Sequence, residues 1–262
     1  MIQFNFKRFS KLARWSLTND KKYHVKSFLQ MFVVLLLFFL FFTSILLNYN
    51  SQPANYQACG FAAIAVFAIT PIIGSSFMFY SMSGKHDMQT LLMLPASNLE
   101  KYLMRYISWI LLLPLYLVAF LAADLLQYLF GLIVGHEEVR FVASTVVDLV
   151  SDFWHKYPSA EHPTIVWSLV FVFTWIHSVY ALGATFFRSN KYNWIPTTLI
   201  VVLLAMFLIW ISPDDRGSSA HDSSSIADIV ESAIYVFVIG LNFWLSYRLF
   251  CRRQVIGKLV NL

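Results

Sequence analysis

Charged residues are scarce in this chain of 262 residues: 13% are charged, against 58% hydrophobic and 18% aromatic residues. An ordinary soluble domain is about 25% charged and about 45–50% apolar, and a single soluble core could not hide this surplus of apolar side chains. The composition therefore excludes an ordinary water-soluble enzyme and, for the same reason, an intrinsically disordered chain. It predicts a polytopic membrane protein.

Cysteines and short catalytic motifs are also scarce. Two cysteines, Cys59 and Cys251, are too few for a disulfide framework. The sequence has no Gly-x-x-x-x-Gly-Lys-Ser/Thr phosphate loop, no His-Glu-x-x-His zinc motif and no Gly-x-Ser-x-Gly nucleophile elbow. We therefore assign no catalytic, cofactor-binding or metal-binding residue. A basic groove with interleaved aromatics is absent too, so nucleic acid is not an expected partner.

The long apolar runs predict transmembrane helices. A helix needs about 20 mostly apolar residues to cross the hydrocarbon, and none of the runs alternates at period two as barrel strands do. The sequence thus predicts an all-α, polytopic membrane helix bundle with six spans. They are Phe28 to Leu47, about Gln57 to Met82, about Leu103 to Val134, Thr164 to Phe187, Trp194 to Ile211, and about Ile229 to Phe250.

The positive charges orient these spans. All 19 Lys and Arg residues except Arg140, Lys156 and Arg216 lie in the N-terminal tail, in the loops after the second and fourth spans, or near the C-terminal end. The positive-inside rule then places both termini in the cytoplasm. We expect a single domain, 1–262, in which residues 28–250 form the bundle and residues 251–262 form a cytoplasmic tail.

Residues 1–27 are predicted to form an amphipathic cytoplasmic helix. At helical spacing, Ile2, Phe6, Phe9, Ala13 and Leu17 fall on one face, and basic residues fall on the opposite one. Such a helix lies in the membrane interface with its basic face toward anionic lipid headgroups. It either anchors the first span alone or also contacts a cytoplasmic partner.

The loop between the second and third spans carries a short apolar segment and a helix start. Its apolar residues are Met88, Leu91, Leu92 and Leu94. Pro95 ends this segment. Ser97 and Glu100 form a capping box, which predicts a new helix that begins at Ser97 and continues into the third span. The loop is either a simple turn or a lever that transmits force from a cytoplasmic partner.

This loop resembles the permease subunits of type-2 ATP-binding-cassette (ABC) exporters, which carry a similar Leu-Leu-Met-Leu-Pro-Ala-Ser-x-x-Glu pattern (here residues 91–100) between the second and third spans. Asn98 replaces the Arg that the family often has there. The resemblance implies that residues 85–101 form the coupling helix that docks into a separate ATPase subunit, that a second permease copy completes a homodimer, and that this chain is not itself an enzyme. The implied coupling residues are Lys85, Asp87, Leu91, Leu92, Leu94, Pro95, Ser97, Glu100 and Lys101.

Polar residues at membrane depth are further candidates. His177 is expected near the middle of the fourth span, where it either lines a translocation path or is a neutral side chain bonded to a neighbouring helix. Asp124 is expected near the outer boundary and partly hydrated. In the outer loop, 135–163, apolar residues recur at helical spacing and predict a surface helix that caps the bundle or serves as a gate or partner site.

The expected function is that of an ABC transporter permease in a bacterial cytoplasmic (inner) membrane, moving a substrate by alternating access while a separate ATPase binds the ATP. Two alternatives remain open at the level of the sequence. One is a membrane-embedded enzyme acting on lipid, which would need clustered intramembrane carboxylates or histidines beyond His177. The other is a scaffold or sensor that transports nothing.

Overall fold

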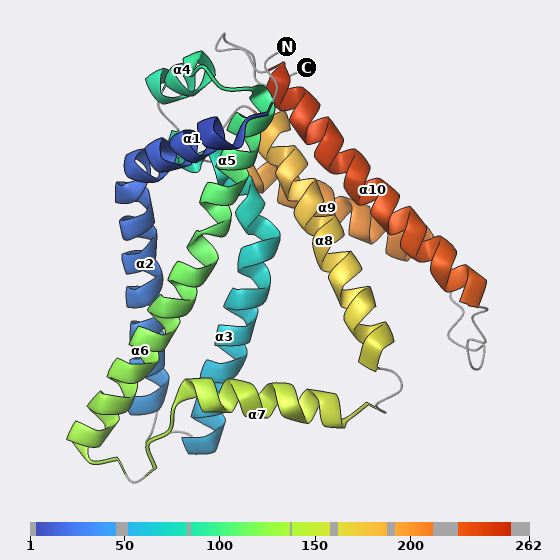
Figure 1. The fold of residues 1–262 in the computed structure, drawn as a ribbon. Helices are drawn as coiled ribbons and strands as arrows, with labels where there is room; N and C mark the ends of the chain where they lie inside the picture. Colours follow the sequence, from blue (N-terminus) through green and yellow to red (C-terminus); the bar gives the residue numbers. More distant parts are fainter. Residues whose placement is uncertain are drawn as a thin grey trace. The chain divides into compact units, whose positions relative to one another are not determined.

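The computed structural model describes residues 4–45, 52–82, 85–136, 138–157, 162–187, 192–211 and 225–252. These residues form helices and no β-strand, which confirms the predicted all-α class (Figure 1). The α-helices are α1 (Phe6–Asn19), α2 (Lys21–Leu40), α3 (Gln52–Gly74), α4 (Lys85–Met93), α5 (Asn98–Ile110), α6 (Leu112–Val134), α7 (Val142–His155), α8 (His162–Phe186), α9 (Trp194–Ile211) and α10 (Ser225–Cys251).

Five helical stretches in the described part of the chain are long and apolar enough to cross a membrane. They are Lys21–Ile45, Pro53–Met82, Asn98–Val134, Ile165–Phe186 and Ser232–Cys251. Helix α9 is apolar over the shorter stretch Trp194–Phe207. The membrane-helix character of the chain is thereby supported, whereas the number of six spans and the side on which the termini lie stay predictions.

The N-terminal region differs from the single helix expected over residues 1–27. Helix α1 ends at Asn19 and α2 begins at Lys21, so the helix of the first span starts before its apolar run. Lysine is a strong helix former, which allows α2 to begin among basic residues. On α1, Leu12 and Ser16 are buried, whereas Phe6 is 74% exposed. The buried face of α1 therefore differs in part from the apolar face predicted from the sequence.

Two of the predicted spans change their helical geometry where proline interrupts them. Helix α3 contains Pro71 and passes at Gly74 into a 3₁₀-helix, Ser75–Met82. The third span is divided at Leu111 into α5 and α6, and Pro114 lies in the first turn of α6. Proline removes a backbone donor and crowds the preceding turn, so both interruptions follow from the sequence.

The chain divides into two compact units. The first unit comprises Met1–Ala13, Ile72–Tyr106 and Val166–Leu262, and the second comprises Arg14–Pro71 and Ile107–Ile165. The predicted single permease domain therefore stays a prediction.

The core of the second unit is aromatic and tightly packed. Phe39 of α2 is fully buried and meets the ring of Phe120 of α6 edge-on, with centroids 6.0 Å apart. Small residues lie beside them, Cys59 and Ala63 on α3 and Ala123 on α6. Small side chains let helix backbones approach closely, which favours association of helices inside a membrane.

The first unit is held together more by polar side chains. Ser246 of α10 accepts hydrogen bonds from Tyr102 Oη (3.0 Å) and Thr185 Oγ1 (3.1 Å), and donates to the carbonyl of Ala181 (2.9 Å). Gly183 of α8 leaves room for Thr197 of α9, because a Cβ at residue 183 would lie 2.1 Å from Thr197 Oγ1. These contacts join α5, α8, α9 and α10.

Candidate functional site

The segment predicted to couple to a partner, residues 85–101, folds as an elbow in the first unit (Figure 1). Helix α4 ends at Met93, two residues before Pro95, as predicted from the disfavoured helical conformation before proline. Helix α5 then begins at Asn98. We call residues 85–101 the elbow segment.

The predicted capping box closes this turn. The Ser97 Oγ accepts the Glu100 N–H at 3.2 Å, and Glu100 Oε2 accepts the Ser97 N–H at 2.9 Å. Two donors that the first turn of α5 would leave unpaired are therefore satisfied reciprocally. The capping-box prediction is confirmed.

Glu100 also binds the start of α1, which the sequence did not indicate. Arg8 Nε and Nη2 donate to the two carboxylate oxygens at 2.8 and 2.7 Å, and the Asn5 N–H donates to Oε1 at 2.7 Å. The Asn5 side chain in turn accepts the backbone N–H groups of Lys7 (3.0 Å) and Arg8 (3.3 Å). A single buried carboxylate thus joins the starts of α1 and α5, and its hydrogen bond raises the pKa of Arg8 above the ordinary value.

Lys101, the other charged residue at this end of the elbow segment, is also turned inward. It is 4% exposed, and its Nζ donates to the Leu92 carbonyl at 2.7 Å. This carbonyl belongs to the last turn of α4, where backbone acceptors lack partners within the helix. Lys101 therefore fixes α4 against α5. Neither Glu100 nor Lys101 presents its charge on the surface.

The elbow segment exposes fewer apolar side chains than its sequence indicates. Met88 and Leu91 are buried at 8% and 1% exposure, and Leu92 and Leu94 are half-buried. The exposed side chains among its described residues are Asp87, Thr90, Met93, Pro95, Asn98 and Leu99. Met93 is the most prominent, at 84% exposure. The side chain of Lys85 lies outside the described residues. An exposed apolar tip on a braced helix is suited to docking.

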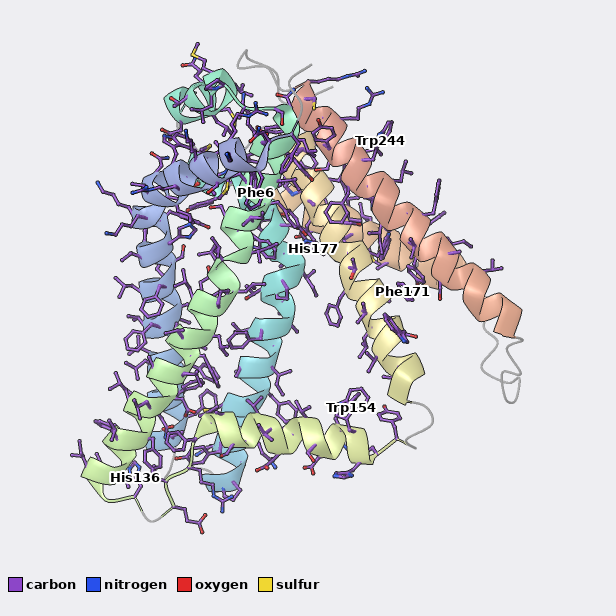
Figure 2. The ribbon with its side chains drawn as sticks, in the orientation of Figure 1. Phe6, His136, Trp154, Phe171, His177 and Trp244 are labelled. Carbon is purple, nitrogen blue, oxygen red and sulfur yellow. The ribbon has the colours of Figure 1, made fainter. Side chains whose placement is uncertain are left out.

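His177 of α8, which is labelled in Figure 2, lies in an aromatic cluster within the first unit. The Tyr106 hydroxyl of α5 hydrogen-bonds His177 Nε2, and their ring centroids are 5.7 Å apart. Phe243 of α10 packs against both rings, at 6.2 Å from His177 and 5.9 Å from Tyr106. Ser75 Oγ donates to the His177 carbonyl at 3.0 Å. The expected bond from His177 to a neighbouring helix is present, and a role in translocation stays a prediction.

Asp124 differs from the partly hydrated residue that we expected. It is 2% exposed, and its two oxygens accept the N–H groups of Val142 at 2.7 Å and Ala143 at 2.9 Å. These are the first two residues of α7, so Asp124 caps a helix that begins 18 residues later. The helix predicted in residues 135–163 is confirmed as α7, whose first turn is bound to α6, and its place on the outer side stays a prediction.

Arg105 enters the sequence-based prediction only through its positive charge, yet it is among the most deeply buried side chains of the first unit. It is 2% exposed, its Nε donates to the Met78 carbonyl at 3.2 Å, and its Nη2 bonds Ser81 Oγ. It therefore supports the 3₁₀-helix that precedes the elbow segment. Arg105 lies four residues after Lys101 on α5. Residues at i and i+4 share one face of a helix, so burial of one of them could have indicated burial of the other.

No metal site is evident in the part of the chain that is described, since no three His, Cys, Asp or Glu residues lie together in a way that could hold an ion. Comparison with known proteins adds no identification: no protein-family model, no curated protein and no solved structure matches this chain. The resemblance to ABC permeases therefore remains a hypothesis based on the sequence pattern.

Proposed function

We propose that the chain is the membrane-spanning subunit of an ABC exporter, with six spans, both termini in the cytoplasm and the elbow segment as the contact for a separate ATPase. The observation that carries the proposal is the bracing of this short cytoplasmic element. Glu100 and Lys101 tie α4, α5 and the start of α1 together through charge-assisted hydrogen bonds, while Met93 is left on the surface.

Bracing of this kind is what force transmission requires. A load applied to α4 passes through Lys101 into α5, which continues into the third span, instead of being lost in a loose loop. A partner that binds two states of the bundle with different affinity shifts the equilibrium between them. Because one chain offers at most six spans, we place the translocation path between two copies related by a two-fold axis. His177, with Tyr106 and Phe243, is its candidate lining.

Co-purification tests the partner. The tagged full chain, isolated from its native bacterial inner membrane, is expected to bring an ATPase subunit with it. Met93→Glu should reduce the yield of this subunit at least tenfold, because it puts a charge on the exposed apolar tip. Thr18→Glu adds the same charge on the exposed part of α1 and should leave the yield unchanged. Robust ATP hydrolysis by the isolated chain, or no associated ATPase, would refute the proposal.

Accessibility tests the topology. In a background with Cys59 and Cys251 replaced by serine, Met93→Cys should resist an impermeant thiol reagent in intact cells and react after permeabilisation. Asp152→Cys on α7, also exposed, should react in intact cells because α7 is placed on the outer side. Labelling of residue 93 from outside would reverse the orientation and remove the site of the ATPase.

A further inference from the structure

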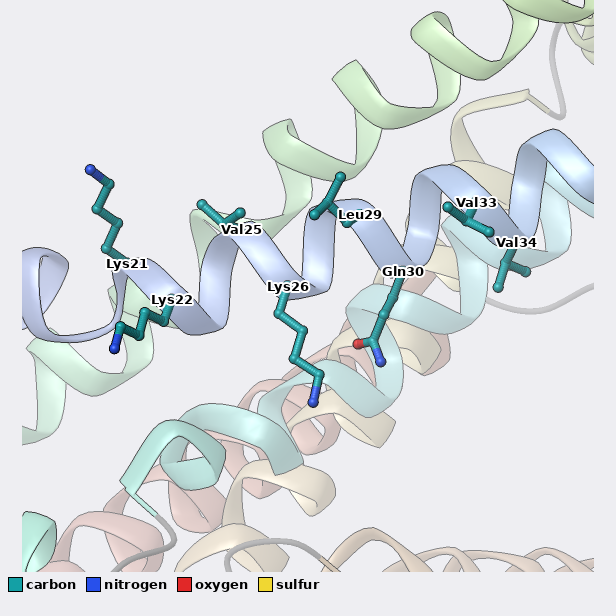
Figure 3. A pocket seen from close by; sticks show the side chains of 8 residues that line it. All are labelled: Lys21, Lys22, Val25, Lys26, Leu29, Gln30, Val33 and Val34. Atoms are coloured by element: carbon teal, nitrogen blue, oxygen red, sulfur yellow. The ribbon is translucent and has the colours of Figure 1, made fainter.

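The first four turns of α2, about 14 residues from Lys21, carry a groove that the proposed transport function does not use. It has a volume of about 890 Å³ and is open to the surface of the second unit (Figure 3). Among the described residues, those that line it come from α2 and are Lys21, Lys22, Val25, Lys26, Leu29, Gln30, Val33 and Val34. All eight are exposed, so the groove offers its whole lining to an occupant.

The lining is ordered by chemistry along the helix. Lys22, Lys26 and Gln30 follow one another at intervals of four residues and extend from the same side of α2 (Figure 3). Val25, Leu29 and Val33 form an adjoining row with the same interval. At 1.5 Å per residue, the polar row descends about 12 Å from the start of α2 toward its apolar half. Cations thus come first, then an amide, and then aliphatic side chains alone.

We propose that this groove binds one anionic phospholipid at the cytoplasmic surface of the membrane. The headgroup phosphate lies between Lys22 and Lys26, the amide of Gln30 donates to an ester carbonyl of the glycerol region, and an acyl chain lies along Leu29 and Val33. A phospholipid presents phosphate, ester and hydrocarbon in the same order with depth. Basic residues beside a span attract anionic headgroups, and exposed aliphatic residues at this depth face acyl chains.

The charge of the groove is what selects this occupant. Three lysines lie within six residues, 21–26, two of them on the side of Gln30, and the described lining residues include no acidic side chain. A second copy of this same face would bring lysine against lysine, which disfavours a symmetric protein contact. An anionic headgroup instead neutralises the cluster. The site depends on α2 lying in a membrane and does not require a motor subunit, so it can hold even if the ATPase proposal fails.

Native mass spectrometry of the purified full chain with added phosphatidylglycerol or phosphatidylcholine of matched acyl chains tests the headgroup. The wild type should bind phosphatidylglycerol at least tenfold more tightly. One basic side chain near an anionic surface contributes about fivefold to affinity, so Lys22→Gln with Lys26→Gln should weaken phosphatidylglycerol binding roughly 25-fold and leave phosphatidylcholine unchanged. Arg140→Gln with Lys156→Gln removes the same charge from exposed residues outside the groove and is the matched control. Equal binding of both lipids, or an equal loss in the control, would overturn the proposal.

A photo-crosslinking residue in place of Leu29 identifies the occupant in the membrane. A lipid adduct that disappears with Lys22→Gln and Lys26→Gln supports the site. A crosslink to a second copy of the chain, or to another protein, shows that the groove is a protein interface and refutes the lipid proposal.

Discussion

Glu100 in the first unit and Asp124 in the second are both buried carboxylates that satisfy the start of a helix, at 0% and 2% exposure. Glu100 caps its own helix, three residues from Ser97, and also receives the charged guanidinium of Arg8. Asp124 caps α7, 18 residues away, and accepts hydrogen bonds from two backbone N–H groups. Glu100 caps the helix to which it belongs and pairs with a full charge. Asp124 caps a helix that is distant in the sequence and interacts only with the N–H dipoles at its start.

The largest effect is expected from removing the distant cap. Asp124→Ala leaves the N–H groups of Val142 and Ala143 without acceptors, and Val142 is fully buried, so water does not replace the carboxylate easily. Each unpaired buried donor costs about 1–3 kcal/mol. We expect the free energy of unfolding in detergent micelles to fall by about 3 kcal/mol.

Two variants calibrate this loss. Asp124→Asn keeps one acceptor oxygen and should cost about half as much, whereas Asp148→Ala changes an exposed carboxylate on α7 and should be nearly neutral. If Asp124→Ala were as stable as Asp148→Ala, the distant cap would contribute nothing and α7 would be held by its apolar contacts alone.

We call the contact of Glu100 with Arg8 and the Asn5 N–H the ionic clamp. It is expected to keep the start of α1 ordered. Glu100→Ala removes the acceptors of the Asn5 N–H and the Arg8 side chain together. Hydrogen exchange at the Asn5 amide should accelerate roughly tenfold, because local opening there no longer breaks charge-assisted bonds. Glu100→Gln, which retains acceptor oxygen but no charge, should give a smaller increase. An unchanged Asn5 rate in Glu100→Ala would show that α1 is positioned by its apolar side alone.

Removing only the local part of the cap has a smaller effect on stability. Ser97→Ala deletes the hydroxyl that accepts the Glu100 N–H and should cost about 1 kcal/mol, the usual contribution of an N-cap side chain. Ser97→Asp keeps an acceptor and should retain most of the stability. Asn98→Ala, at the exposed next position, is the neutral control, and equal losses at residues 97 and 98 would contradict the capping role.

The same contrast explains how much could be predicted from the sequence. The Ser97–Glu100 cap, the break at Pro95 and the helix from Val142 follow from spacing within one or two turns, and each is present. The partner of Glu100 could not be predicted, because Arg8 lies 92 residues away in the sequence. The charge of Arg8 is also explained by the positive-inside rule alone, so nothing in the sequence indicated a second role for it. The sequence predicts a hydrated Asp124 because no residue near it in the chain indicates a hydrogen-bond donor for its carboxylate, and the donors of Val142 and Ala143 are brought to it by the fold.

The smallest predicted effect separates the ionic clamp from the dipolar cap directly. The Arg8 side chain is 31% exposed, so dissolved ions screen its attraction to Glu100, whereas the neutral donors of α7 carry no net charge to screen. Raising ionic strength from about 0.05 M to about 1 M should accelerate hydrogen exchange at the Asn5 amide about threefold and leave that at Val142 unchanged. In Arg8→Gln the salt response of Asn5 should vanish, because the screened pair no longer exists. An equal response at both amides would mean that salt acts on the whole fold and not on the clamp.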